Sequence, residues 1–373
     1  MSPRNRFVMH RARLLALVGL VSLLPVAPSG HAQTPRALPD RISDSAFWTL
    51  QGDISEPDAY FRIEDNYTSN EIEIGQLFTL LRNGHISGGV YMGVGPEQNL
   101  TYIAAIRPKM AFIVDIRRQA AMQHLMFKAL FEMSKDRAEF ISQLFSKPRP
   151  AGLDSTTTIQ KMWDAFYAVR TDSVLGNRTW TRIIERLTKT HGFTFTADES
   201  NKLKAVYDAF YYFGPAITTR GSNSGRGGSN TLVDLTGYST DAMGVAQSFL
   251  STEENYQYVK SLHERNLIVP VTGDFGGVKA VRAVGAWLKD HGGVVSAFYV
   301  SNVEQYLFQD GKANAFYENV GTLPIDSTSV FIRPYSMRRG SAGVTRSLCP
   351  IATFLQAVRA GHVYSNNEAL ACG

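Results

Sequence analysis

The residues best placed to bind a ligand are two glycines and an acid that end two apolar runs. Gly93 and Gly95 follow the first run, and Asp115 ends the second, 22 positions after Gly93. The residues from Pro96 to Arg107 lie between the runs and have the apolar spacing of a helix. This order predicts a βαβ unit with a ligand site at its edge: a strand, a glycine turn, a helix, a second strand and a terminal acid.

Each of these residue types has a chemical use. Glycines let backbone N–H groups approach a ligand, and the start of the following helix favours an anion. Asp115 can accept hydrogen bonds from both hydroxyls of a ribose diol. The alternative for the two glycines is a tight turn that binds no ligand. The alternative for Asp115 is a helix N-cap. The residues expected to contact a ligand or cofactor are Gly93, Gly95, Pro96, Glu97, Gln98, Asn99, Asp115, Arg117 and Gly273.

Two later segments could supply catalytic groups to the same edge. The glycine turn 273–277 and the segment 301–306 each follow an apolar run. The carboxyl ends of parallel strands meet at one edge of a sheet, so both segments should face one site. Asp274 and Glu304 are therefore candidate general bases. Asp274 also fits an ordinary turn residue, and Glu304 also fits an ion pair with an arginine at that edge.

The wider pattern is that of an α/β protein. Apolar runs alternate with helical stretches before residue 134 and after residue 267. We expect a Rossmann-like open, mostly parallel sheet with helices on both faces and a mostly helical insertion at about 134–230. Within that insertion, 219–230 predicts a mobile loop or a lid. The expected boundaries are a signal peptide at 1–32, a lead-in at 33–59, the Rossmann-like domain at 60–345 and a C-terminal segment at 346–373.

The first 32 residues are typical of an export signal. Arg4–Arg13 form a basic region, and Leu14–Val26 form an apolar stretch that is short for a membrane span. Ala32 ends a small-x-small cleavage pattern. We expect a periplasmic or secreted protein with no transmembrane segment in the mature chain. An uncleaved N-terminal anchor is the alternative.

The positive charge belongs largely to that leader. Residues 1–32 contain four arginines and no acid, so the remainder has 38 − 4 = 34 basic residues against 33 acidic ones. A nearly neutral body provides little field for a polyanion, which excludes nucleic acid as the expected partner.

The cysteines and histidines predict no metal site. Cys349 and Cys372 are the two cysteines of the chain, and two thiols alone cannot complete a tetrahedral zinc site. In an oxidising compartment they would form a structural disulfide, and two buried free thiols are the alternative. The sequence contains no H-E-x-x-H motif and no close cluster of His, Asp and Glu.

The motifs at the first two runs carry a family resemblance. YMGVGPE at 91–97 and FIVD at 112–115 resemble the first two strands of class I S-adenosylmethionine-dependent methyltransferases. Together with GDFGG at 273–277 and SNVEQYLF at 301–308, they also resemble an exported bacterial family of that fold. The resemblance covers most of residues 60–335.

This resemblance implies S-adenosylmethionine as the cofactor. Gly93, Gly95 and Asp115 would hold it, and Asp274 would lie near the reacting atoms. Glu97 replaces the third glycine of the family's turn. No Asn-Pro-Pro-aromatic signature is present, so the resemblance implies no substrate class.

Two functions remain open from the sequence. The first is an exported protein that binds a small nucleoside-like or anionic ligand at the Gly93–Asp115 edge, with methyltransferase-like group transfer. The second is a non-catalytic envelope scaffold whose helical insertion binds another protein. S-adenosylmethionine is made in the cytoplasm, so export favours reuse of the fold for another ligand.

The leader can be tested separately. Residues 1–45 fused to a reporter that is active only after export should give activity, because the basic, apolar and cleavage regions follow in order. A fusion in which two aspartates interrupt the apolar stretch is the control and should be inactive. An inactive first fusion would contradict the expected export.

Overall fold

The strands form a doubly wound sheet, as the alternation of apolar runs and helices predicts. A computed structural model describes residues 36–63, 65–71, 74–221, 230–333 and 347–372. In this part of the chain six strands lie in the order β3-β2-β1-β4-β5-β6. The first five are parallel, and β6 is antiparallel to β5. The strands are β1 (Val90–Gly93), β2 (Met110–Asp115), β3 (Ile268–Thr272), β4 (Val295–Tyr299), β5 (Val330–Ile332) and β6 (Leu348–Pro350).

The strand order reverses direction between β1 and β4. Every residue of β1 to β5 is buried, which explains why these strands are continuous apolar runs rather than alternating ones. Such a reversal is the place where open α/β sheets leave a crevice beyond the carboxyl ends of their strands.

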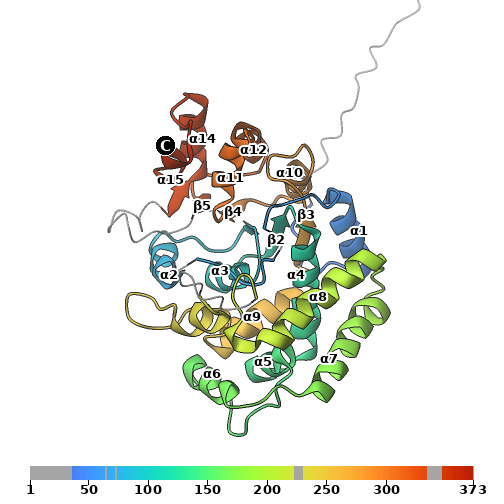
Figure 1. Ribbon diagram of the computed structural model, residues 1–373. Helices are drawn as coiled ribbons and strands as arrows, with labels where there is room; N and C mark the ends of the chain where they lie inside the picture. Colours follow the sequence, from blue (N-terminus) through green and yellow to red (C-terminus); the bar gives the residue numbers. More distant parts are fainter. Residues whose placement is uncertain (1–35, 64, 72–73, 222–229, 334–346, 373) are drawn as a thin grey trace, which may run out of the picture. The chain divides into compact units, whose positions relative to one another are not determined.

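Helices cover the sheet on both sides. In Figure 1, α3 (Gln98–Ile106), α4 (Arg118–Met133) and α9 (Glu253–Glu264) lie below the strands, and α10 (Ala280–Asp290) and α12 (Ala313–Val320) lie above them. Residues 118–133 form α4 as one continuous helix. Its central residues are buried because α4 packs against β2, β3 and α9 and against several helices of the insertion described below.

The helical insertion lies between β2 and β3. It packs around α4 through α8 (Ala197–Phe213), whose Val206 and Phe210 are buried. The remaining helices of this region are α5 (Arg137–Phe145), α6 (Ile159–Tyr167), α7 (Ser173–Glu185) and the π-helical turns η1 (Arg186–Thr190) and η3 (Asp234–Tyr238), with a 3-10 turn η2 (Gly214–Ala216). Residues 222–229 of the expected loop lie outside the described residues, as does the expected signal peptide.

The lead-in expected at 33–59 contains a helix. Residues 44–54 form helix α1 (Asp44–Ile54), which packs against β3 and α10. Phe47 and Ile54 are buried seven positions apart on one face, and Ser43 caps the helix by accepting from the Ala46 N–H. The cap and the spacing were the available signals, although the helix carries few other apolar residues.

The C-terminal segment returns to the sheet. β6 pairs with β5, and α14 (Ile351–Arg359) and α15 (Asn366–Leu370) follow it. Cys349 in β6 forms a disulfide with Cys372, with a Cα–Cα distance of 5.6 Å. This is the pairing that the sequence favours over free thiols. Helices α2 (Ile74–Asn83) and α11 (Val303–Gln309) complete the elements used below. Among the described residues, no helix is long and apolar enough to cross a bilayer.

Loss of the disulfide should lower stability without altering the sheet. The bond closes a loop with a sequence separation of 23. A loop of that size is expected to contribute about 3 kcal/mol. We expect C349S/C372S, and wild type in reductant, to unfold at a lower urea concentration, with a free energy of unfolding that is smaller by this amount. An unchanged midpoint in both would show that the bond restricts the unfolded chain little.

Candidate functional site

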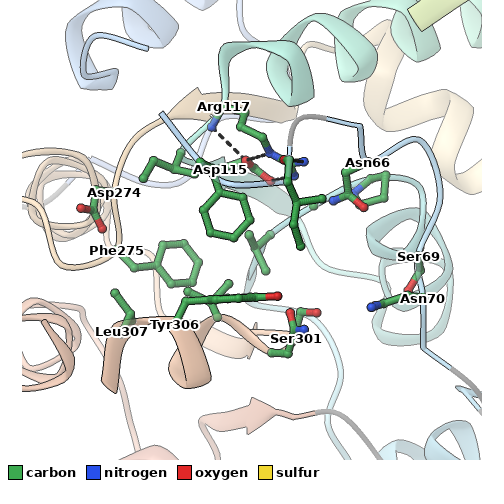
Figure 2. Close-up of a pocket in the computed structure, with 18 of the residues that line it drawn as sticks. Asn66, Ser69, Asn70, Asp115, Arg117, Asp274, Phe275, Ser301, Tyr306 and Leu307 are labelled. Atoms are coloured by element: carbon green, nitrogen blue, oxygen red, sulfur yellow. Dashed lines mark hydrogen bonds and ion pairs between the residues drawn. The ribbon is translucent and has the colours of Figure 1, made fainter. Parts of the chain in front are cut away.

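A pocket of about 650 Å³ lies beyond the carboxyl ends of β1, β2, β3 and β4 (Figure 2). It is therefore at the reversal of the strand order, where a ligand site is expected in this fold. Of the residues singled out from the sequence, those that line it are Gly95, Pro96, Asp115, Arg117, Gly273 and Asp274.

The turn after β1 is held by Asn99 rather than by a ligand. The Asn99 amide donates to the carbonyl oxygens of Val94, Gly95 and Pro96 at 3.0, 3.1 and 2.7 Å. Its oxygen accepts from the Tyr91 hydroxyl at 3.0 Å. Asn99 therefore positions the turn, and this fully buried side chain does not line the pocket. These bonds also delay the helix, which begins at Gln98 and not at Pro96.

The two glycines serve different needs. A Cβ on Gly93 would lie 2.0 Å from the Asn99 side-chain oxygen, so Gly93 makes room for that amide and does not line the pocket. Gly95 has φ +80°, a conformation that favours glycine, and faces the pocket with only Asn66 near its Cβ position. The His124 ring contacts Gly95, with Nε2 2.9 Å from the Gly95 carbonyl oxygen. Burial lowers the pKa of His124 to about 4, so its neutral ring donates this bond.

Glu97 and Gln98 lie behind the pocket and not in it. Both are buried, and neither lines the cavity. The Glu97 carboxyl accepts from the Ser69 backbone N–H at 3.1 Å through either oxygen. Burial raises the pKa of Glu97 to about 8. The residue in place of a third turn glycine thus ties the turn to the segment before α2.

Asp115 is held by Arg117 in a buried two-point ion pair, drawn with dashed lines in Figure 2. The Arg117 Nε and Nη2 groups donate to the two carboxylate oxygens, each at 3.0 Å, and the Arg117 backbone N–H donates at 2.9 Å. Three of about four acceptor positions are therefore used. A ribose diol offers two donors, so Asp115 cannot accept both as the sequence suggests.

Arg117 keeps donors for the pocket. Its Nη1 donates to the Ile63 carbonyl at 3.3 Å, which brings the partnered guanidinium N–H groups among the described residues to three of five. The charge of Asp115 raises the pKa of Arg117 against the opposing effect of burial, which is the larger single influence. Arg117 is thus a fixed cation at the wall of the pocket.

The turn after β3 is closed by a carboxylate from the N-terminal segment. Glu56 accepts from the backbone N–H groups of Asp274, Lys279 and Ala280 at 3.0, 2.9 and 2.9 Å. The start of α10 therefore carries an internal anion. Asp274 accepts from the Gly276 N–H at 2.9 Å and from Lys312 Nζ at 2.6 Å, and it faces the pocket.

Glu304 is the clearest correction to the candidate site. It does not line the pocket, and it is 1% exposed. Its carboxylate accepts from Arg333 Nε and Nη2 at 2.6 and 2.9 Å and from the Tyr317 hydroxyl at 2.9 Å. The register of α11 turns this side chain inward to a buried ion pair, so Glu304 is not a base in the pocket.

The sequence reasoning missed one wall of the pocket. This wall joins the segment before α2 to the segment after α8. The Tyr67 N–H donates to the Thr219 carbonyl at 2.9 Å, and the Thr219 hydroxyl donates to the Ser69 carbonyl at 3.2 Å. The side chains that this wall and the neighbouring α11 bring to the pocket include Tyr60, Phe61, Asn66, Arg220 and Tyr306. Tyr306 belongs to the segment 301–306 and Arg220 to the predicted loop 219–230, but Tyr60, Phe61 and Asn66 carry no motif, because only the folded chain brings them to the pocket.

Comparisons with known proteins identify a family but no activity. Residues 67–205 and 235–350 match the family model described as a domain of unknown function (DUF7790). No curated protein matches the chain. Among the described residues, no group of three or more His, Cys, Asp and Glu side chains is placed to hold a metal ion.

Glu97 should make stability depend on pH. Folded Glu97 keeps its proton to about pH 8, whereas the unfolded chain releases it near 4.5. The folded state binds more protons in this window, so its stability falls as pH rises through it, by up to about 1.4 kcal/mol per pH unit. Urea unfolding at several pH values should show a steeper fall in wild type than in Glu97→Gln, because Glu71, whose pKa burial also raises, contributes equally to both proteins. Glu318→Gln, at an exposed position, should keep the slope; equal slopes in all three proteins would contradict the assignment.

Proposed function

The chain belongs to this DUF7790 family, and on that premise we propose that it is an exported protein that binds a small nucleoside-like or anionic ligand in the pocket. The observation that carries the proposal is the meeting of four parallel strand ends at a cavity of about 650 Å³. Small-molecule sites typically have volumes of about 300–1,000 Å³ and lie at this place in open α/β sheets.

The lining favours a ligand that has both a flat part and an acidic group. Phe61 and Tyr306 meet edge to face with ring centroids 5.0 Å apart and offer aromatic surface. Arg117 presents two guanidinium N–H groups beyond its three partnered ones, and Arg220 adds an exposed cation at the rim. Paired N–H donors of arginine suit a carboxylate or a phosphate.

S-adenosylmethionine is the cofactor that the methyltransferase resemblance implies. The arrangement of the residues fits it poorly, because Asp115 has one acceptor position left for a diol that needs two. We therefore derive no chemical step from it and keep it in the ligand panel. Of the two general bases that the sequence suggests, only Asp274 faces the pocket.

Two features support an exported location for this activity. The leader has the order of an export signal, and the disulfide between Cys349 and Cys372 suits an oxidising compartment. A ligand met outside the cytoplasm is consistent with a pocket that does not hold a nucleoside cofactor in the expected way.

The test is a thermal-shift screen of the mature protein with nucleosides, nucleotides, S-adenosylmethionine and small organic anions. A true ligand at 100 times its Kd should add about 2.7 kcal/mol of stability. Asp115→Ala should abolish the shift, because Arg117 loses the partner that fixes it. Arg220→Gln should weaken binding without affecting the fold, since the side chain is exposed.

Glu304→Ala is the matched control. Like Asp115→Ala, it removes the carboxylate of a buried ion pair with arginine, but this pair lies outside the pocket. Each substitution should lower the free energy of unfolding by about 3–5 kcal/mol. Glu304→Ala should retain the ligand shift. If no compound in the panel stabilises wild type and native mass spectrometry of protein from its own compartment finds no retained molecule, the scaffold function is favoured instead.

A further inference from the structure

Ser301 stands at a strained turn that faces the pocket. It lies between β4 and α11 with φ +46°, and it lines the cavity. Arg107 and Ser146 also have positive φ, but each ends a helix, where that conformation is common. Ser301 instead precedes a helix. A serine on a strained strand-to-helix turn at the top of a parallel sheet is the geometry that exposes a nucleophilic hydroxyl.

A buried carboxyl group contacts that hydroxyl. Ser301 Oγ donates to Glu71 Oε1 at 2.7 Å, and Glu71 is 8% exposed. Among the described residues, no cation forms an ion pair with Glu71. Its titratable neighbours are the hydroxyls of Tyr91, Tyr102 and Tyr299, all of which are buried.

The environment of Glu71 makes it a stronger base than an exposed glutamate. Burial raises its pKa, while the hydrogen bonds from Ser301 and Tyr299 act in the opposite direction. A carboxylate with raised basicity in contact with a serine hydroxyl is the arrangement that activates a nucleophile. Ser301 and Tyr306 lie across the pocket from Asp115 and Arg117 (Figure 2).

We propose that Ser301 is a catalytic nucleophile and Glu71 its general base, in the hydrolysis of a small carboxylic ester that carries an acidic group. The inference rests on the proposed function, because the substrate occupies the same pocket. The acidic group would lie toward Arg117, and the ester toward Ser301. Asn70 and Asn302 line the pocket and supply neutral amide donors for the oxygen that becomes negative.

The step balances without a further co-reactant. Ser301 Oγ bonds to the acyl carbon and its proton passes to the Glu71 carboxylate. The C–O bond to the alcohol breaks, and the leaving oxygen takes that proton. Water then attacks the acyl-serine, gives a proton to Glu71, and the acid leaves as Ser301 regains its proton.

The first experiment treats the mature protein with a fluorophosphonate probe and maps the adduct by mass spectrometry. An activated Ser301 forms an O–P bond as fluoride leaves. We expect one adduct, at Ser301, forming more slowly as pH falls through a pKa above the usual Glu value of about 4.3. Glu71→Gln should slow labelling by about 100-fold or more and remove that pH dependence.

Two variants separate chemistry from folding. Ser301→Gly removes the hydroxyl and suits the positive φ, so it should fold at least as stably as wild type and remain unlabelled. Ser146→Ala changes another serine of positive φ, which contacts the Tyr207 hydroxyl outside the pocket, and should be labelled at the wild-type rate. Folding of each variant is verified by its melting temperature.

The second experiment compares 4-nitrophenyl hemisuccinate with 4-nitrophenyl butyrate. We expect the acidic ester to be hydrolysed with the higher kcat/KM, and Arg220→Gln to reduce that preference.

No adduct on wild type, an adduct retained in Ser301→Gly, or Glu71→Gln labelled at the wild-type rate would each overturn the inference. A ligand shift without labelling would overturn the nucleophile alone and leave the binding proposal standing. Labelling of Ser301 without any ligand shift supports the nucleophile and counts against the proposed ligand classes.

Discussion

The side-chain amide of Asn99 is the interaction on which the site depends. It holds three successive carbonyl groups, those of Val94, Gly95 and Pro96, and so fixes where β1 ends and α3 begins. This explains why position 93 is glycine, since any Cβ would collide with that amide. The shape of the pocket floor is therefore set by a contact inside the protein and does not await a ligand.

Two other sites that a parallel sheet offers to ligands are taken by the chain itself. Glu56 supplies the anion at the start of α10, and Arg117 takes most of the acceptor capacity of Asp115. Both contacts leave the pocket open while changing what it can recognise. The carboxylate that would hold a diol instead supports a guanidinium, whose paired N–H donors suit acids.

The fold could be predicted from the sequence because buried parallel strands are apolar on both faces and stand out as continuous runs. The same runs locate the carboxyl ends of the strands, which a parallel topology brings to one edge of the sheet. The partners of individual carboxylates could not be predicted in this way. Glu56 lies 224 positions from Ala280, and the arginine that neutralises Glu304 comes from the end of another strand. Such partners depend on tertiary distance, which leaves no local pattern.

The hydrogen bond between Tyr67 and Thr219 joins a residue inside the ranges that match the family to one outside them. Thr219 and Arg220 fall between the two ranges that match the family, whereas Gly95, Asp115 and Asp274 fall inside them. The strand ends that line the cavity thus lie inside the matched ranges, whereas part of the wall facing them is built by residues outside those ranges. The match to the family therefore covers the frame of the pocket but not its whole lining.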